Sequence, residues 1–289
     1  MPNVPEFGSL PFDHYVIAKW DSTSPLSKSE QKRALVEQWV KLGHYGRREY
    51  VDQPPIKQEI PPDVPRDLLT EHDRVLDKRP EQTLWIRTWF GDKDSKASQE
   101  AADAGYAKVY RHAVQGDIDT AENQSNGLMG EVLMFTDRHE FGRGFRSEAS
   151  SSGLDPDIRD GIALGTPGSL PWYVLRAMMH CPDHVVTWSQ RHLQDPEEEL
   201  DKYQKVLVVV VDRKACEDGW VLMFALNHKG AILPLRARNK AYWVDMTVIG
   251  WISDCTPLNE MGEDSDDEQE MYMAEGDGWD YTPDTAEHL

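Results

Sequence analysis

An unbroken run of aliphatic residues, Val206–Val211, constrains the fold more than any other part of the sequence. It consists of five valines and one leucine, with no polar residue among them. β-Branched residues favour strands, and a continuous apolar run is typical of a strand that is covered on both faces. We therefore predict that this segment lies at the centre of a sheet.

The residues after this strand predict an antiparallel meander. Trp220–Leu226 is a second apolar run, and the turn-forming sequence Asn227–Gly230 separates it from a third run at Ala231–Leu235. Pro234 lacks the N–H that a central strand donates, so we expect the third strand to lie at an edge or to end there. A fourth strand is predicted at Thr247–Ile252.

A strand followed by a helix begins the predicted domain. Thr83–Phe90 alternates and is rich in β-forming residues, and Ser95–Ala113 carries its apolar residues at helical spacing. Glu131–Thr136 is a further strand that could pair beside the first. Together these segments predict an α+β fold, in which a mixed sheet has a βα start and a C-terminal antiparallel meander, with helices packed on the sheet.

The N-terminal part of the sequence predicts an arm with one helix. Ser27 followed by Glu30 fits a capping box, which predicts a helix over Lys28–Leu42. A short strand is expected at His14–Trp20. The segment Asp52–Pro65 holds five prolines and is typical of a stiff, extended connector.

These segments divide the chain into three predicted parts: an arm at 1–65, a globular domain at 66–259 and an acidic tail at 260–289. The tail contains twelve Asp and Glu and no Lys or Arg, within a chain of formal net charge −20. Such a composition predicts disorder in isolation. Methionines and aromatic residues interrupt the carboxylates, which suits docking to a basic groove, folding back on the protein's own positive surface, or a plain solubilising role.

The sequence predicts a soluble, intracellular protein. No run approaches the roughly 18 apolar residues of a membrane helix, and the N-terminus lacks the features of a signal peptide. The three cysteines have unrelated spacings, so they predict reduced thiols rather than a disulfide framework. We expect a cytoplasmic location, with the nucleus as the alternative, and no cofactor. The acidic balance argues against direct contact with nucleic acid, and no membrane partner is expected.

Residues near two predicted strand ends are candidates for ligand binding. Arg87 lies in an otherwise apolar strand, where it predicts either an anion-binding residue or a salt bridge within the sheet. Asp137, His139 and Glu140 follow another strand end and could form an acid/base pair, with Arg143 or Arg146 clamping a carboxylate or phosphate. A charged surface loop is the simpler interpretation of these residues.

A second candidate is the sequence HCPDH, which contains His180 and His184. Zinc accepts histidine ligands, and two histidines four residues apart on one helix can share a metal ion. Pro182 makes a continuous helix through this segment unfavourable. The alternative is a helix junction at which these polar residues act as caps.

A family resemblance rests on several parts of the sequence. They are the strand and turn at Leu84–Ser95 (LWIRTWFGDKDS), the later runs VLVVVVD, VLMFAL and LPLRA, and the residues Tyr242 and Trp243. The chain resembles an uncharacterised domain family whose members open with a strand of the type LxxRTDFSDD and close with a meander. Trp89 stands where that family usually has Asp. The resemblance implies a fold, and no assigned activity comes with it.

Two functional hypotheses follow from the sequence. The first is a non-catalytic protein-interaction module that contacts a basic protein through its acidic, aromatic-containing tail. The alternative is a small-molecule enzyme or ligand-binding protein with a pocket under the glycine-rich segment 137–168.

Overall fold

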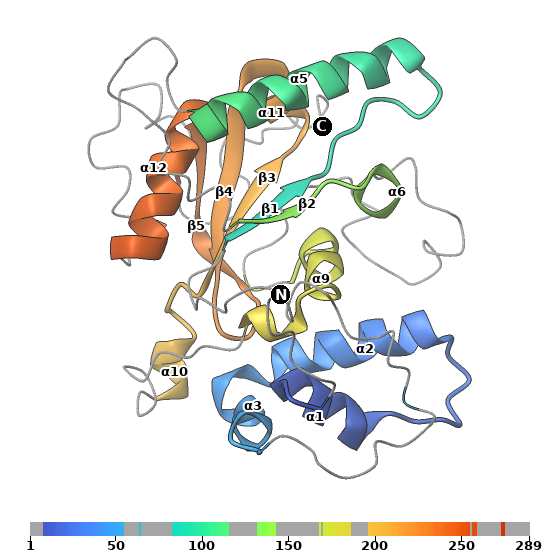
Figure 1. The fold of residues 1–289 in the computed structure, drawn as a ribbon. Coiled ribbons are helices and arrows are strands. Elements are labelled where there is room, and N and C mark those ends of the chain that lie inside the picture. Colours follow the sequence, from blue (N-terminus) through green and yellow to red (C-terminus); the bar gives the residue numbers. More distant parts are fainter. Residues whose placement is uncertain are drawn as a thin grey trace, which may run out of the picture. The chain divides into compact units, whose positions relative to one another are not determined.

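The computed structural model of the chain (Figure 1) describes residues 8–54, 64, 83–115, 132–142, 168, 170–185, 196–254, 256–258 and 273–274. Its fold is α+β, with helices packed on a mixed sheet, which confirms the predicted fold class. Most of the proline-rich connector, most of the acidic tail, and Arg143 lie outside the described residues. No helix in the described ranges is long and apolar enough to cross a membrane.

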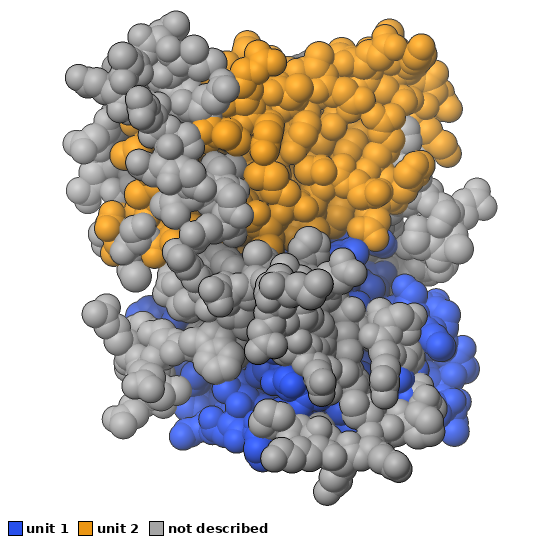
Figure 2. All heavy atoms as spheres, viewed as in Figure 1, with its two compact units in different colours: residues 1–80, 174–205, 227–230 blue, residues 81–173, 206–226, 231–289 orange. Residues whose placement is uncertain are grey.

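The chain groups into two compact units (Figure 2). Unit 1 combines residues 1–80, 174–205 and 227–230, and unit 2 combines residues 81–173, 206–226 and 231–289. This division differs from the predicted boundaries after residues 65 and 259. The N-terminal helices share their unit with segments that lie far along the chain.

Unit 2 is built on a sheet whose described strands have the order β2-β1-β3-β4-β5-β6. The strands are β1 (Thr83–Arg87), β2 (Leu133–Phe135), β3 (Val206–Val211), β4 (Trp220–Leu226), β5 (Ile232–Lys240) and β6 (Met273–Ala274). β1 is parallel to both β2 and β3, and the pairs from β3 to β6 are antiparallel. The valine-rich strand β3 is therefore internal, as predicted.

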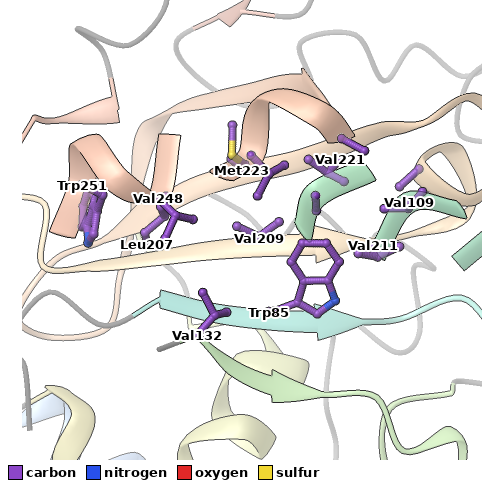
Figure 3. Close-up of a cluster of buried hydrophobic side chains, with 14 of the residues drawn as sticks. Trp85, Val109, Val132, Leu207, Val209, Val211, Val221, Met223, Val248 and Trp251 are labelled. Carbon is purple, nitrogen blue, oxygen red and sulfur yellow. The ribbon is translucent and has the colours of Figure 1, made fainter. Parts of the chain in front are cut away.

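One face of this sheet packs under helices. Trp85, Val209 and Met223 lie opposite one another on β1, β3 and β4 and belong to one buried cluster. Figure 3 shows these side chains together with Val109 of α5 (Lys96–Gln115) and Val248 of α12 (Val244–Ile249). Burying a side chain of this size stabilises the fold by roughly 1.5–3 kcal/mol.

The opposite face of the sheet is buried as well. Val208 and Val210 of β3, with Leu222 and Phe224 of β4, have no exposed surface. When a strand is covered on both faces, no side chain faces water, so no position favours a polar residue. This accounts for the unbroken aliphatic run of β3.

The third strand of the meander is longer than predicted. β5 continues to Lys240 and pairs with β6 on its far side, so the prediction of an edge strand, or of a strand that ends at Pro234, is wrong. Pro234 falls between the pairs Leu226↔Ile232 and Phe224↔Arg236, where the register shifts. A residue without an N–H is tolerated there because the ladder is already interrupted.

The predicted fourth strand, Thr247–Ile252, is also wrong. These residues lie in α12 and in the π-helical segment η7 (Gly250–Asp254). Val244, Val248 and Trp251 are buried in the cluster under the sheet. Their spacing of four and three residues is that of a helix, and burial of this stripe overrides the β-propensity of the local sequence.

The polar connector after β3 contains a short helix, α11 (Arg213–Asp218). The Asp212 carboxylate accepts the N–H of Ala215 and caps its start, and Gly219 ends it with a φ of 82°. α11 packs against α5, and so does the 3-10 turn η6 (Ala241–Trp243). The connection from β3 to β4 is thus part of the helical layer (Figure 1).

Unit 1 is helical in its described residues. Its elements are α1 (Pro11–Lys19), α2 (Lys28–Lys41), α3 (Gly43–Val51), the part of α9 (Trp172–Met178) from Val174 onward, η4 (Pro182–Val185) and α10 (Glu197–Leu200). The Ser27–Glu30 capping box is present, as predicted. The strand expected at His14–Trp20 is instead part of α1, whose start is stabilised because Asp13 accepts the N–H groups of Gly8 and Leu10.

An aromatic cluster joins these helices. Trp39 of α2 packs against Phe12, Tyr15 and Tyr50 of α1 and α3. Its indole N–H donates a hydrogen bond of 2.9 Å to the carbonyl of Pro182. Residues more than 140 positions apart in the sequence are therefore tied together within unit 1.

Candidate functional site

The carboxyl ends of three parallel strands meet at one edge of the sheet in unit 2. Arg87 ends β1, Phe135 ends β2 and Val211 ends β3, and the N–H of Thr88 donates to the carbonyl of Val211 at 3.0 Å. α/β proteins commonly place ligand-contacting residues at such an edge. We refer to Arg87, Asp103, Arg138, Asp212 and Arg238 as the strand-end cluster.

Asp103 of α5 is shared by two arginines. Its carboxylate oxygens accept hydrogen bonds of 2.7 Å from Arg87 and from Arg138, the first residue of α6 (Arg138–Phe141). Burial raises the pKa of Asp103, but the hydrogen bonds and the positive charges of the two arginines outweigh it and lower the pKa. The shared carboxylate joins β1, α5 and α6.

The guanidinium of Arg87 lies between two aromatic rings, 4.3 Å from the ring centre of Phe90 and 4.5 Å from that of Tyr106. Only 7% of the Arg87 side chain is exposed. Arg87 therefore forms an ion pair with a residue of α5, whereas the sequence interpretation placed the salt bridge within the sheet, and cation–π contacts add to this pair.

A second ion pair of the cluster is fully buried. Both terminal nitrogens of Arg238 donate to the two oxygens of Asp212, at 2.9 and 2.6 Å. Arg238 also donates to the carbonyl of Trp220 at 3.1 Å. This bidentate pair links β5 to the start of α11, and such geometry is the strongest form of an ion pair in proteins.

The other predicted ligand residues lie on α6. The Asp137 carboxylate accepts the N–H groups of His139 and Glu140 at 2.7 and 3.0 Å, so this segment begins as a capped helical turn. His139 is exposed and Glu140 half-buried. The structure thus brings Arg87 and α6 together through Asp103, and Arg143 falls outside the described residues.

His180 and His184, the predicted metal ligands, belong to unit 1 and not to the unit that holds the strand-end cluster. The helix α9 ends before Pro182, and η4 begins there, as expected for an interrupting proline. Over the described ranges, no group of three or more His, Cys, Asp and Glu side chains is placed to hold a metal ion.

A histidine network in unit 1 was missed by the sequence reasoning, which assigned Asn227–Gly230 only to a turn. Nδ1 of His228 accepts the N–H of His44 at 2.8 Å, and Nε2 donates to Asp201 at 2.9 Å. Burial lowers the pKa of His228, and the hydrogen bond to Asp201 opposes part of that effect. Both ring nitrogens are occupied, so this histidine holds the turn in place.

The sequence reasoning also missed a strand that pairs with β5 on the side away from β4. Met273 and Ala274 of the acidic tail pair with Ala237 and Arg236 as β6, although the sequence predicts a disordered tail. No pattern in the tail distinguishes this dipeptide from its neighbours. Among its described residues, the tail is attached to the sheet through this dipeptide.

Two large apolar side chains lie exposed just beyond β5. Trp243 is 43% exposed at the end of η6, and Met246 is 48% exposed on α12. The side chain of Asn239 on β5 donates to Thr247 of α12 at 3.2 Å, which fixes the helix beside the strand.

The sequence matches no protein-family model, and the comparisons with curated proteins and with solved structures find no relative. The resemblance of Leu84–Ser95 and the meander to an uncharacterised domain family stays a prediction.

Proposed function

We propose that the protein is a non-catalytic interaction module that binds a basic protein through its acidic tail. The observation that carries the proposal is the pairing of Met273–Ala274 with β5. Through this pairing the folded sheet anchors a segment whose flanking sequence is strongly acidic, with six Asp and Glu among residues 263–270. Lys- and Arg-rich segments are the complementary partners for such a run.

The chemistry of the described site supports binding over catalysis. In the strand-end cluster, the carboxylates of Asp103 and Asp212 are held by arginines. Burial raises the pKa of Cys216 to about 12, which disfavours the thiolate that a nucleophile requires. His228 has both ring nitrogens occupied. These groups are arranged to hold the fold together.

The proposal includes an intracellular location, in the cytoplasm or the nucleus. Cys181 and Cys216 are free thiols. Free thiols suit a reducing compartment. Microscopy of the tagged full-length protein tests this part directly, and secretion into the medium would contradict it.

The binding test uses the full chain and a fluorescent Lys/Arg-rich peptide in an anisotropy titration. Replacing the six carboxylates of residues 263–270 with amides should weaken binding about tenfold or more and flatten its salt dependence. The melting temperature should stay nearly unchanged, because Asp and Glu side chains are almost never part of a buried core.

A matched control removes the same kind of charge from the body of the protein. Glu100 of α5 and Glu198 of α10 are exposed, and Glu37 of α2 is half-buried. Replacing them with glutamine should leave the affinity for the basic peptide within about twofold, since the proposal places the binding charges in the tail and single exposed charges contribute little. Equal loss of affinity in both variants would show that net charge, and not the tail, attracts the peptide.

A further inference from the structure

The imidazole ring of His14, in α1, has a carbonyl oxygen next to each of its two nitrogens. Nδ1 lies 2.9 Å from the carbonyl oxygen of Tyr50 in α3, and Nε2 lies 2.7 Å from that of Gly8. The residue is buried, with 3% of its surface exposed. A carbonyl oxygen only accepts hydrogen bonds, so both contacts are hydrogen bonds only when both ring nitrogens carry a proton.

A neutral imidazole cannot form this pair of hydrogen bonds. Whichever tautomer is present, the neutral ring has one N–H group and one unprotonated nitrogen. The unprotonated nitrogen would turn its lone pair toward a carbonyl oxygen, which is unfavourable in a buried site. The contacts of His14 are therefore those of an imidazolium cation. His228 differs, because its Nδ1 accepts an N–H group.

Two neighbouring features favour a positive charge at His14. The carboxylate of Asp13 accepts the N–H of Gly8 at 2.9 Å, so Gly8 is held by a carboxylate at its N–H and by the imidazole at its carbonyl. Tyr50 is the next-to-last residue of α3, and α1 lies against this helix. The carbonyl groups of a last helical turn lack N–H partners within the helix, and the helix dipole favours a cation beside them.

On α1 itself, the titratable neighbours of His14 are Asp13, Tyr15 and Lys19. Tyr15 is neutral, because burial raises the pKa of its hydroxyl, which donates to Gln38 of α2 at 3.2 Å. Lys19 is exposed and lies five positions further along the chain. α2 contacts α1 through the side chains of Gln38 and Trp39, which do not titrate. The charge that shares Gly8 with His14 is thus the carboxylate of Asp13, which favours the cation.

The charges that α3 and η4 bring to α1 offset one another. The positive charge of Arg47 on α3 interacts with the carboxylate of Asp183 in η4, which accepts the N–H of Phe12 at 3.0 Å. Burial raises the pKa of Tyr50 to about 12, so the hydroxyl of this residue stays neutral. The remaining titratable residues of the two elements are His44, Tyr45, Arg48, Glu49 and His184.

We infer that His14 is a pH switch in the N-terminal part of unit 1. As the imidazolium it holds Gly8 and the end of α3 to α1, and as the neutral imidazole it keeps only one of these two hydrogen bonds. The bonded form carries the additional proton, so the stability that it adds is present in acid and is lost as the pH rises. The inference goes beyond the proposed function, since it involves no residue of the acidic tail.

His14 and His228 should respond to pH in opposite directions. Protonation of His228 removes the acceptor for the N–H of His44, whereas deprotonation of His14 removes the donor for one carbonyl. The stability of the whole unit therefore contains both effects. A test of the switch must observe His14 and Gly8 themselves, or compare two chains that differ only at His14.

The first experiment is an NMR titration of the full-length chain between about pH 5.5 and 8.5, on either side of the pKa of a free histidine. Long-range correlations between ring protons and ring nitrogens distinguish the imidazolium from the neutral ring, and His14→Gln assigns the His14 signals. Loss of one ring proton should coincide with a shift of the Gly8 amide signal. His139, which is exposed in unit 2, is the control, and its titration should leave the Gly8 signal in place.

The second experiment measures what the proton adds to the stability. Glutamine at position 14 can donate to one of the two carbonyls and does not titrate. At about pH 5.5 the unmodified chain should melt about 2–4 °C above His14→Gln, on the scale of one hydrogen bond in a chain of this size. At about pH 8.5 this difference should fall to about half or less. His139→Gln is the matched control and should melt with the unmodified chain at both pH values.

Four outcomes would overturn the inference. A neutral His14 ring at pH 5.5 in the folded chain would show that one carbonyl has no donor. Retention of both ring protons up to pH 8.5 would make His14 a permanent cation. A Gly8 signal that stays in place while the ring loses a proton would separate protonation from the contact. A melting difference that is equal at both pH values, or larger at pH 8.5, would contradict the direction. None of these results depends on the basic peptide, so the inference and the proposed function can fail separately.

Discussion

At the scale of single residues, a glycine can permit a backbone conformation and a close side-chain contact that other residues would not allow. Gly43 begins α3 with a φ of 67°, which other residues rarely adopt. A Cβ atom on Gly43 would lie 2.9 Å from two ring atoms of His228. The glycine therefore allows both the turn between α2 and α3 and the close approach of the histidine.

The first prediction compares two glycines with positive φ. Gly219→Ala should cost about 1 kcal/mol from backbone strain, because a Cβ there meets open space. Gly43→Ala should cost about 1–3 kcal/mol more, since the ring of His228 must also move. Urea unfolding of both variants measures the difference. Equal costs would mean that His228 moves aside freely.

The buried pair of Arg238 and Asp212 gives a second prediction. Arg238→Met should destabilise the protein by about 3–5 kcal/mol, because it leaves the Asp212 carboxylate buried without its cation. Asp212→Asn keeps an oxygen that can accept the N–H of Ala215 and removes the charge. The double variant should lose less stability than the sum of the single variants, and a denaturation cycle measures this coupling. Additive losses would contradict a strong pair.

At the scale of elements, α5 and α11 are held together by close backbone contact. Gly105 of α5 is the point of approach, since a Cβ atom there would clash with the backbone carbonyl oxygen of Cys216. A backbone atom of a packed helix has little freedom to yield. The absence of a side chain at Gly105 therefore determines how closely the two helices pack.

The third prediction tests this contact. Gly105→Ala should destabilise the protein by about 1–3 kcal/mol despite the better helix propensity of alanine, because α11 must shift. Gly46→Ala in α3 is the control. Its nearest neighbour is Cβ of Leu42 at 3.0 Å, in the residue that precedes α3, so the net change should stay within about 1 kcal/mol. Thermal unfolding of both variants provides the comparison.

At the scale of elements, some helices and strands could be predicted from the sequence and others could not. β3 and β4 were identifiable because a buried strand consists of apolar residues alone, and α2 because Ser27 and Glu30 cap it. Thr247–Ile252 was misread because β-branched residues favour strands, whereas the apolar positions follow a helical period. Short helices such as α11 depend on one cap and one glycine, which are weak signals in a polar segment.

The candidate sites were harder to predict than the elements. Arg87 was recognisable because a charge in an apolar strand requires a partner, but that partner, Asp103, comes from the next helix and is one of many exposed acids. His228 meets residues 27 and 184 positions away. The pairing of Met273–Ala274 with β5 rests on backbone hydrogen bonds, which the side-chain pattern does not reveal.

At the scale of the whole molecule, each of the two units is assembled from three separate segments of the chain. Unit 1 combines three separate segments, among them the four residues Asn227–Gly230 between β4 and β5. His228 lies in this short segment, and its bonds to His44 and Asp201 join all three parts of unit 1. The protonation state of the His228 imidazole therefore affects the hydrogen bonds that hold the three parts of unit 1 together.

The last prediction concerns the pH dependence of unit 1. Burial lowers the pKa values of both His228 and His44, and the positive charge of Arg47 lowers them further. An unfolded histidine has a pKa of about 6.5, so below that pH the unfolded chain binds more protons than the folded one. The stability should therefore be complete above about pH 6.5 and should fall as the pH is lowered toward the folded pKa values. Protonation of Nδ1 would also end its role as acceptor for the N–H of His44.

Hydrogen exchange at pH 7.5 and pH 5.5, corrected for the intrinsic rates, measures this effect on α2 and α3. His228→Asn supplies an oxygen in place of Nδ1 and cannot be protonated in this range. It should cost about 1 kcal/mol at pH 7.5, for the loss of the bond to Asp201. The His228→Asn substitution should also reduce the loss of hydrogen-exchange protection of α2 and α3 at pH 5.5. If the variant and the unmodified chain lose protection in parallel, His228 is not the group whose protonation loosens unit 1, and His44 becomes the residue to replace next.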